Sequence, residues 1–442
     1  MKKPSLLLIL TVFLSSVHMI KAQFPTFTRI DTSVICTAGG YTLDGAFGDF
    51  NNDGLDDLLI LSANHEPEPN FHMLFVNEGN WNFRQIMEDP VVESSTLQGS
   101  HGANWGDYDN DGDLDLFVAS FYNSNNLLFT NNGDGSFTQV LNGSIVNDGG
   151  DSGPATWIDI ENDGYIDLYV SNHSKQNNFL YHNNGDGTFT RFTSGQLVNF
   201  SLFLDQGMSS VDIDNDRDND IFGYAPLERN YLYLNDGYGN FSLVDRGVIT
   251  DNDYEAFTCG WGDYDNNGCL DLFTGTYNVN PSYELVGEYD ILYHNNGDGT
   301  FTVVTGIEPV SEIIGTDEGC WADFDNDGYL DLFTYAIWGA NNKLYKNNGD
   351  GTFTKLDIPA FTDDTSGRAS LADMNNDGFI DIFISRGYMK YGPTENLIYA
   401  NNGNSNSWLT VKLIGMVSNK DAFGARVKAK ATIGGSQVWQ VR

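Results

Sequence analysis

The amino-acid sequence predicts an all-β protein, a seven-bladed β-propeller of four-stranded blades followed by the start of a small C-terminal β module. Three observations predict it. An acidic segment, exemplified by Gly106-Asp-Tyr-Asp-Asn-Asp-Gly-Asp-Leu-Asp-Leu116, occurs seven times at intervals of 50 to 60 residues, which is the length of one four-stranded blade. A glycine-rich segment, exemplified by Asn131-Asn-Gly-Asp-Gly135, follows it at a regular distance. The N-terminal region also supplies a strand that the last repeat lacks.

The second copy of the repeat shows how one blade is predicted to be built. Small and apolar residues at 103–106 form an inner strand that leads into the acidic segment. Residues 114–120 form a second strand, whose nearly continuous apolar character predicts burial on both faces. A third strand covers residues 127–130, the segment 131–135 forms a hairpin turn, and residues 137–140 form the outer strand. The other copies divide in the same way.

The two ends of the repeat region are predicted to meet. Residues 24–30, Phe-Pro-Thr-Phe-Thr-Arg-Ile, match the outer-strand motif Gly-Thr-Phe-Thr, whereas the seventh copy ends at Asn401-Asn-Gly403 without such a strand. We therefore expect residues 26–30 to complete the last blade and close the ring, which removes exposed sheet edges. The alternative is an N-terminal tail whose similarity arises by chance.

The composition excludes several classes of partner. The chain has 442 residues, of which 61 are acidic and 22 basic, so that its formal net charge is −39. Nucleic acids and anionic membrane surfaces require basic patches, so neither is an expected partner. Disorder would also produce a high net charge, but a hydrophobic content of 40% and an aromatic content of 13% are enough for a large core.

Three regions follow from the sequence. Residues 1–22 resemble a secretory signal peptide, with Lys2 and Lys3 before an apolar stretch and a cleavage site after Ala22. The alternative is an uncleaved anchor. Residues 23–404 form the propeller, and residues 405–442 form the C-terminal segment. We expect no transmembrane segment, and a mature protein that is secreted or held at the cell surface. Four scattered cysteines are expected to be buried free thiols.

The acidic segments have the pattern of metal-binding loops, D-x-[DN]-x-[DN]-G-x-x-D. Side-chain oxygens fall at loop positions 1, 3, 5 and 9, and the main-chain oxygen of position 7 can add a fifth ligand. Calcium prefers this number of hard oxygen ligands. Glycine at position 6 permits the sharp turn that directs alternate side chains to one centre. These are not EF-hands, because position 12 carries no glutamate and strands flank the loop. The alternative reading is a set of solvated acidic turns.

The predicted ligands share these four loop positions in each of the seven repeats. In chain order they are Asp49, Asn51, Asp53 and Asp57; Asp107, Asp109, Asp111 and Asp115; Asp159, Glu161, Asp163 and Asp167; Asp212, Asp214, Asp216 and Asp220; Asp263, Asp265, Asn267 and Asp271; Asp323, Asp325, Asp327 and Asp331; and Asp373, Asn375, Asp377 and Asp381. We predict six or seven calcium ions, because in the fourth loop Arg217 replaces the glycine.

These loops closely resemble the FG-GAP/VCBS repeats of integrin α-subunit propellers and their bacterial relatives, over roughly residues 40–403. The resemblance implies that the four side chains and the position-7 carbonyl bind calcium, directly for six loops and less directly for the Arg217 loop. Residues 408–428 resemble the start of the ASPIC/UnbV module, which follows such repeats in the cartilage acidic protein family. The family resemblance implies calcium-dependent structure with adhesion or ligand recognition.

The sequence predicts a binding module and not an enzyme. It contains no HExxH, no G-x-S-x-G and no phosphate-binding loop with its lysine. His182 and His294 occupy the same repeat position, which indicates a structural role, and His101 is expected to be packed. The face opposite the loops is predicted to present aromatic side chains and one histidine, namely His65, Tyr122, Tyr224, Tyr277, Tyr283, Trp338, Tyr388 and Tyr391.

The predicted function is therefore that of a secreted calcium-binding propeller that recognises an extracellular protein or carbohydrate. Aromatic side chains with polar neighbours suit both kinds of ligand, although ordinary loop packing explains them equally well. Two alternatives remain open at this point. One is a structural subunit of a secreted assembly, and the other is a polysaccharide lyase or hydrolase on a propeller scaffold.

Overall fold

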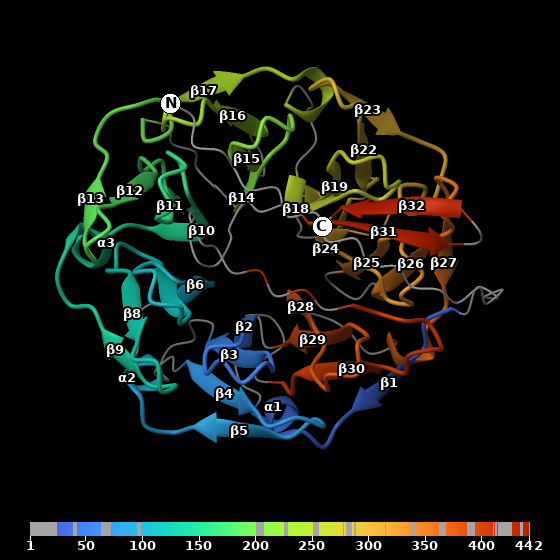
Figure 1. Ribbon diagram of the computed structural model, residues 1–442, viewed down its shortest axis with the longest axis horizontal. Helices are drawn as coiled ribbons and strands as arrows, with labels where there is room; N and C mark the ends of the chain where they lie inside the picture. Colours follow the sequence, from blue (N-terminus) through green and yellow to red (C-terminus); the bar gives the residue numbers. More distant parts are fainter. Residues whose placement is uncertain are drawn as a thin grey trace.

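A computed structural model describes residues 24–38, 42–62, 72–94, 99–199, 207–224, 229–250, 256–276, 278–279, 285–286, 289–313, 315–336, 341–361, 368–386, 394–409, 411, 413, 427–433 and 436–441. Within these residues the chain forms seven four-stranded antiparallel sheets, arranged radially in a ring (Figure 1). The predicted seven-bladed β-propeller is confirmed.

Blades one to six use their strands in chain order from the centre of the ring outward, and blade seven takes the N-terminal strand β1 as its outer strand. Blades one to three comprise β2 (Thr42–Gly48), β3 (Asp57–Ser62), β4 (Met73–Asn77) and β5 (Phe83–Ile86); β6 (Ser100–Gly106), β7 (Asp115–Ser120), β8 (Leu127–Asn131) and β9 (Phe137–Gln139); and β10 (Ser152–Ile158), β11 (Asp167–Asn172), β12 (Phe179–Asn183) and β13 (Phe189–Arg191). Blades four and five comprise β14 (Gly207–Val211), β15 (Asp220–Tyr224), β16 (Tyr231–Asn235) and β17 (Phe241–Val244); and β18 (Ala256–Gly262), β19 (Asp271–Thr276), β22 (Ile291–Asn295) and β23 (Phe301–Val304). Blades six and seven comprise β24 (Thr316–Ala322), β25 (Asp331–Ala336), β26 (Lys343–Asn347) and β27 (Phe353–Leu356); and β28 (Arg368–Ala372), β29 (Asp381–Ser385), β30 (Leu397–Asn401) and β1 (Phe27–Ile30).

The remaining elements are short. They are the helices α1 (Val34–Thr37), α2 (Pro90–Glu93), α3 (Ser144–Asn147), η1 (Gly247–Ile249) and η2 (Pro359–Phe361), and the strand pairs β20 (Asn278–Val279) with β21 (Leu285–Val286) and β31 (Lys428–Ile433) with β32 (Ser436–Val441). The last pair is the predicted start of a C-terminal β module; its assignment to the ASPIC/UnbV type remains a prediction. Residues 1–22, predicted to be a signal peptide, lie outside the described residues. No helix of the described part is long and apolar enough to cross a membrane.

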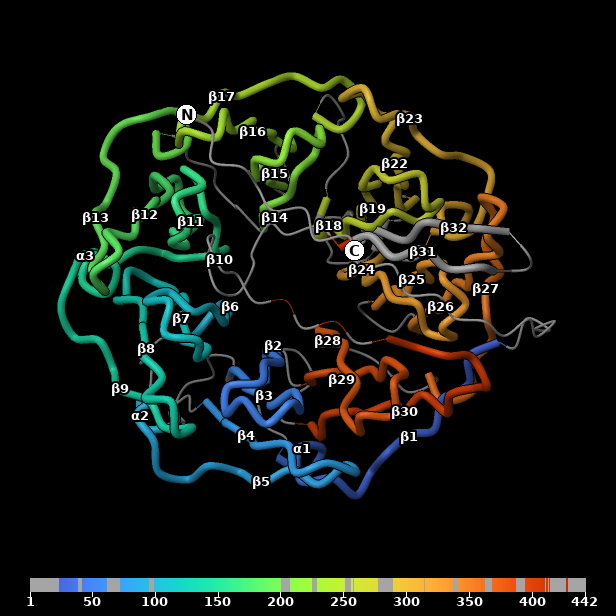
Figure 2. The backbone as a smooth tube through the Cα atoms, viewed as in Figure 1, coloured from blue at the N-terminus to red at the C-terminus, as the bar shows by residue number. Residues whose placement is uncertain are grey.

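The N-terminal strand closes the ring, as its sequence predicts. Strand β1 pairs antiparallel with β30, with Phe27 opposite Asn401 and Ile30 opposite Ile398. In Figure 2 the blue N-terminal strand β1 lies beside the red-orange last blade, where it forms the outer edge next to β30. Phe27 packs against Phe324 and Phe361 at centroid distances of 5.8 and 5.5 Å. One blade is thus built from both ends of the repeat region.

The second strand of each blade is buried, because a neighbouring blade covers each of its faces. All six residues of β7 are buried, as their continuous apolar sequence predicts. Neighbouring blades also pack through aromatic stacking. Trp157 of blade three stacks on Tyr108, which is position 2 of the second acidic loop, with an interplanar angle of 11°. A Cβ atom on Gly106 would lie 2.7 Å from the Trp157 ring, so glycine is required just before the loop. Stacked pairs of this kind hold the first, second and fifth acidic loops against the next blade.

All four cysteines are free, as expected, but the expectation that they are buried is correct only for Cys36. Cys259 and Cys320 lie on the inner strands β18 and β24, and Cys269 lies in the fifth acidic loop; all three are partly exposed. Inner strands have no further strand on their inner edge, so their side chains are covered less completely than those of the second strands.

Candidate metal centres

The seven acidic loops join the first and second strands of each blade and share one backbone conformation. Position 6 is left-handed in each of them, with φ between +80° and +103° at Gly54, Gly112, Gly164, Arg217, Gly268, Gly328 and Gly378. The turn that glycine at position 6 is predicted to permit is therefore present in all seven loops, and Arg217 adopts the same conformation at the expense of backbone strain. Position 4 is an asparagine that is also left-handed, with φ of 60° at Asn110.

The aspartate at position 1 holds the turn. In the second loop, Asp107 Oδ1 accepts the N–H of Asp111 at 2.9 Å, and Oδ2 accepts the N–H of Gly112 at 2.8 Å. The same pair of bonds is present in the third, fifth, sixth and seventh loops. Adjacent loops are also linked, because Asn110 Nδ2 donates to the main-chain oxygen of Gly164 at 2.9 Å. In these five loops the turn is therefore held by the hydrogen bonds of the loop itself.

The aspartate at position 9 is the first residue of the second strand and is at most 1% exposed in every loop. Asp115 Oδ1 accepts the N–H of Asn131 at 2.8 Å, and Oδ2 accepts the N–H of Tyr108 at 3.0 Å. Burial and the neighbouring carboxylates outweigh these bonds and raise the pKa of Asp115 to about 9. A negative charge at this position is unfavourable until a cation compensates it.

The other position-9 aspartates behave in the same way, with burial as the main cause. The pKa is raised to about 7 for Asp57 and Asp220, to about 8 for Asp271 and Asp381, to about 9 for Asp167, and well above its usual range for Asp331.

In three of the loops the structure brings positions 1, 3 and 9 together, whereas position 5, the fourth predicted ligand, is not part of these groups. In the second, fourth and sixth loops, one carboxylate oxygen from each of these positions lies within 4.8 Å of the others. The groups are Asp107, Asp109 and Asp115; Asp212, Asp214 and Asp220; and Asp323, Asp325 and Asp331. In the first and seventh loops position 3 is Asn51 or Asn375, whose amide oxygen accepts the N–H of position 5. Position 5 itself turns toward the backbone: Asp111 Oδ1 accepts the N–H of Asp113 at 2.9 Å.

These residues fit a calcium ion. Asp57 Oδ2, Asp214 Oδ1 and Asp325 Oδ1 are buried and have no hydrogen-bond partner among the described residues. A buried carboxylate oxygen without a partner is costly, and a hard dication is the partner that such oxygens prefer. The ligands named from the sequence would hold the ion. Its positive charge would balance the negative charges of the crowded carboxylates.

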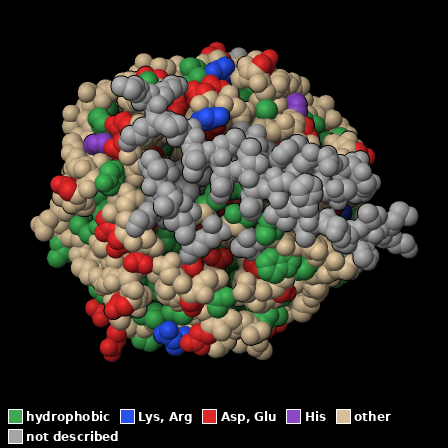
Figure 3. Space-filling view, viewed as in Figure 1, with side chains coloured by type: hydrophobic (Ala, Val, Ile, Leu, Met, Phe, Trp, Pro, Cys, Tyr) green, Lys and Arg blue, Asp and Glu red, His purple; other side chains and the backbone are tan. Residues whose placement is uncertain are grey.

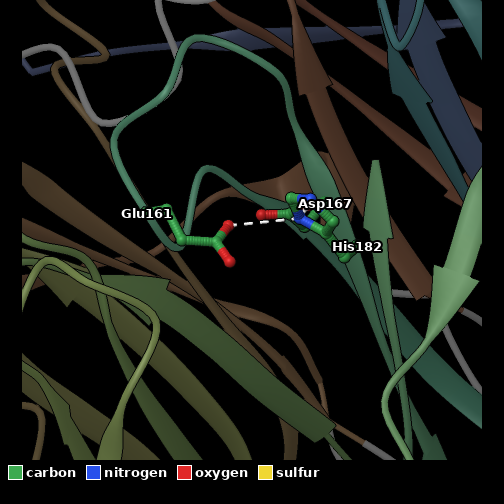
Figure 4. A group of neighbouring side chains, drawn as sticks. All are labelled: Glu161, Asp167 and His182. Atoms are coloured by element: carbon green, nitrogen blue, oxygen red, sulfur yellow. Dashed lines mark hydrogen bonds and ion pairs between the residues drawn. The ribbon is translucent and has the colours of Figure 1, made fainter. Parts of the chain in front are cut away.

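The loop motif does not reveal the side chains that face three of the loops from the third strand of their blades. They immediately precede the asparagine that begins each hairpin. His182 and His294, predicted to be structural, in fact lie against loop carboxylates. His182 Nδ1 is 3.1 Å from Asp167 Oδ1, and His294 Nδ1 is 3.3 Å from Asp271 Oδ1. Figure 4 shows His182 on β12 directed toward the third loop. The equal repeat position of the two histidines was the available signal.

In the sixth loop the same position is Lys346, which is 2% exposed. Its Nζ lies 2.5 Å from Asp325 Oδ2 and 2.7 Å from Asp327 Oδ2. Burial alone would lower the pKa of Lys346, but the carboxylates of Asp331, Asp325 and Asp327 together raise it above its usual range. The sixth loop, which the sequence presents as a full set of ligands, therefore already contains one positive charge.

The fourth loop also has a nearby cation that the sequence did not indicate. Arg246 Nη2 lies 3.6 Å from Asp214 Oδ2, although Arg246 belongs to the connection after β17. Within the loop itself, residues 212–220, the one basic residue is Arg217. Arg217 and Arg246 both place positive charge at this loop. We therefore expect the fourth loop to bind a cation more weakly than the second loop.

The opposite face carries part of the predicted aromatic set. Tyr122 follows β7 and is 54% exposed, and Tyr224 is the last residue of β15 and is half-buried. His65, Tyr277, Tyr283, Trp338, Tyr388 and Tyr391 lie outside the described residues. His101 is buried, with its ring 4.6 Å from that of Phe121 and 5.3 Å from that of His173, so it is packed as expected.

The chain matches a known repeat family over most of the propeller. The family described as FG-GAP-like repeat matches residues 49–118, 107–170, 159–223, 212–274, 285–334 and 335–384. Human cartilage acidic protein 1 is 25% identical over 344 residues, which cover 67% of this chain and 48% of that protein. The mouse protein is 23% identical, with 67% and 50% covered. The chain thus spans about half the length of the curated relatives it matches. The structure of BBS1N in complex with ARL6DN is similar in fold, with a TM-score of 0.51 and 9% identity over 86% of this chain and 99% of that one.

Proposed function

This chain belongs to the FG-GAP-like repeat family, and on that premise we propose that it is an exported, calcium-stabilised propeller that recognises an extracellular protein or carbohydrate and is not an enzyme. The acidic loops are the observation that supports calcium binding. Each loop places a buried aspartate with a raised pKa beside further carboxylates. Dications remove this electrostatic cost.

The recognition surface is assigned to the face opposite the calcium loops. The loops precede the second strand of each blade, so the connections that follow this strand lie at the other end of the blade. In blades two and three these connections are residues 121–126 and 173–178. Tyr122, Asn123, Ser174 and Lys175 have left-handed backbones, with φ of 59° to 60°. Non-glycine residues in this conformation often mark binding sites.

One aspartate holds the two connections together. Asp151 Oδ1 accepts the N–H of Tyr122 at 2.8 Å, and Oδ2 accepts the hydroxyl of Ser174 at 2.5 Å. Gln176 Nε2 donates to Asn123 Oδ1 at 2.5 Å, which links the two connections directly. An exposed aromatic ring on a fixed polar base is suited to stack on a sugar or to anchor a protein loop.

The acidic surface bears on the charge of the protein or carbohydrate ligand. Figure 3 shows Asp and Glu side chains spread over much of the visible face, with few Lys and Arg among them. A nucleic acid would be repelled by this surface. Together with the formal net charge of −39, this favours a neutral or basic ligand.

A glycan and protein array, probed with calcium and with EDTA, tests this function. Tyr122→Ala should reduce binding at least tenfold, because it removes the exposed ring. The control is Tyr238→Ala, which removes a ring of 67% exposure on the hairpin of blade four, on the calcium-loop face. Equal binding by both variants would contradict the assigned face, and turnover of an arrayed polysaccharide would contradict the non-enzymatic role.

A further inference from the structure

Two of the seven loops offer a nitrogen ligand. In the third loop, His182 Nδ1 lies 3.1 Å from Asp167 Oδ1 and 3.3 Å from Glu161 Oε2 (Figure 4). In the fifth loop, His294 Nδ1 lies 3.3 Å from both Asp265 Oδ2 and Asp271 Oδ1. In each case an imidazole nitrogen and two carboxylate oxygens lie within 4.8 Å of one another. The same arrangement occurs twice, from the same repeat position.

The distances match those of a small coordination polyhedron. Zinc binds nitrogen and oxygen at about 2.0–2.2 Å in tetrahedral sites, so that neighbouring ligand atoms are about 3.3–3.6 Å apart. The observed separations between the imidazole nitrogen and the carboxylate oxygens, 3.1 to 3.3 Å, are close to this spacing. The two carboxylates would balance the charge of a dication, and water or the remaining loop oxygens would complete its coordination.

The alternative is that each imidazole simply hydrogen-bonds to an aspartate. His294 argues against it, because Nδ1 is buried and has no hydrogen bond within the described part of the chain, although two carboxylates lie at 3.3 Å. In the third loop, His182 Nδ1 is within hydrogen-bond distance of Asp167 Oδ1, and there Glu161 Oε2 is the buried atom without a hydrogen-bond partner among the described residues. An ion between the three side chains would satisfy the nitrogen and both oxygens at once.

The donor atoms select the metal. Calcium takes oxygen ligands almost exclusively, whereas imidazole suits zinc, cobalt, nickel and copper. We propose that the third and fifth loops are mixed nitrogen and oxygen sites that bind a transition-metal dication of the zinc class, through Glu161, Asp167 and His182 and through Asp265, Asp271 and His294. This inference rests on one part of the proposed function, namely that the acidic loops bind metal ions. It divides the ring into calcium loops and zinc-class loops.

The second loop is a matched control within the same chain. It has an all-oxygen group of Asp107, Asp109 and Asp115. At the repeat position of the histidines it has Thr130, whose hydroxyl lies 2.6 Å from that of Tyr108. His182→Thr and His294→Thr would therefore give the third and fifth loops the side chain that the second loop carries. Thr130→His would make the reverse change.

The test is a titration of the full chain with Co²⁺, which reports nitrogen and oxygen coordination through its visible absorption. The protein is stripped with a chelator, dialysed into saturating CaCl₂ and titrated, and Zn²⁺ is then added in competition. We expect two Co²⁺ ions per chain in the presence of calcium and their displacement by Zn²⁺. His182→Thr or His294→Thr alone should leave one ion, the double variant none, and Thr130→His should add a third.

Two results would overturn the inference. One is a double variant that binds Co²⁺ as the parent does, and the other is complete displacement of Co²⁺ by calcium in the parent. Calcium binding is measured in parallel by dialysis for every variant. Normal calcium binding by a parent protein that takes up no Co²⁺ refutes the zinc-class loops alone, whereas a parent protein that binds no calcium refutes the proposed calcium-stabilised function. Melting curves of each variant in calcium show that the propeller remains folded.

Discussion

Asn131 of blade two donates a hydrogen bond from Nδ2 to the main-chain oxygen of Phe50 in the acidic loop of blade one, at 2.8 Å. It donates a second bond to the oxygen of Leu114 in its own loop at 3.0 Å, and its Oδ1 accepts the N–H of Gly133. The same inter-blade bond joins Asn77 to Met374, Asn183 to Tyr108, Asn235 to Ile160, Asn295 to Ile213, Asn347 to Tyr264 and Asn401 to Phe324. One amide therefore links two neighbouring acidic loops at each blade boundary, and the first of these pairs closes the ring.

Replacement of this asparagine should destabilise the propeller. Asn131→Ala leaves two main-chain oxygens and one N–H without their partner in a buried position, which should lower the free energy of unfolding by about 2–4 kcal/mol. The control is Asn132→Ala at the next residue, which is exposed and bonds only within the hairpin; it should cost about 0.5 kcal/mol. Denaturant unfolding in calcium measures both, and an equal cost would contradict the role of the inter-blade bond.

The raised pKa values of the position-9 aspartates predict a pH dependence that calcium should remove. An unfolded aspartate has a pKa of about 4, while burial raises the pKa to about 7 for Asp57 and about 9 for Asp115. The metal-free folded protein therefore binds more protons than the unfolded chain in this window. Its free energy of unfolding should fall as the pH rises from 5 to 8.

Calcium compensates the ionised carboxylates, so the loss on raising the pH should be much smaller in the loaded protein. The increase in Tm on adding calcium should accordingly be larger at pH 8 than at pH 5. Calorimetry at both pH values, with EDTA and with calcium, measures this difference. An increase that is the same at both pH values would show that these aspartates do not bind the ion.

Much of the fold could be predicted because each blade repeats one local pattern. The loop residues are neighbours in sequence, so positions 1, 3 and 9 could be placed together from spacing alone. Lys346 and His182 could not be placed in this way, since they reach the loops only after the third strand folds back through the hairpin. Arg246 lies still farther away, beyond the fourth strand. A loop motif cannot predict charged side chains that tertiary packing brings to the loop from distant parts of the sequence.

Lys346 should make blade six the least dependent on calcium. Lys346→Met removes the ammonium group from between Asp325 and Asp327 and leaves buried charge unpaired, which should cost about 3–5 kcal/mol in EDTA. Calcium should restore most of this loss, because the loop then has the all-oxygen character of the second loop. Thermal melts in both conditions measure it.

The matched control for this variant is Lys355→Met. Lys355 lies on the adjacent strand β27 and pairs with the partly exposed Glu312, so its loss should be small in either condition. A Lys346→Met variant that is equally destabilised with and without calcium would show that Lys346 contributes through packing and not through the charge that it places beside Asp325 and Asp327.

Ring closure by β1 predicts a contrast between two of its residues. Phe27→Ala should lower the free energy of unfolding by about 2 kcal/mol, because the ring packs against Phe324 and Phe361. Arg29→Ala, at a partly exposed position beside Asp31, should change it by less than about 1 kcal/mol. Removal of residues 24–30 should expose the edge of β30 and cause aggregation. A soluble deletion with an unaltered melt would contradict closure.

The central claim is that calcium in the acidic loops stabilises the propeller, and the melting temperature of the full chain with and without calcium tests it most directly. Extracellular calcium sites have dissociation constants of about 10⁻⁴–10⁻³ M, so a tenfold excess at each site adds about 1.4 kcal/mol. Several such sites should raise Tm by well over about 10 °C relative to the EDTA-treated protein, and Asp115→Asn should reduce that increase. A melting curve that EDTA leaves unchanged would contradict the account.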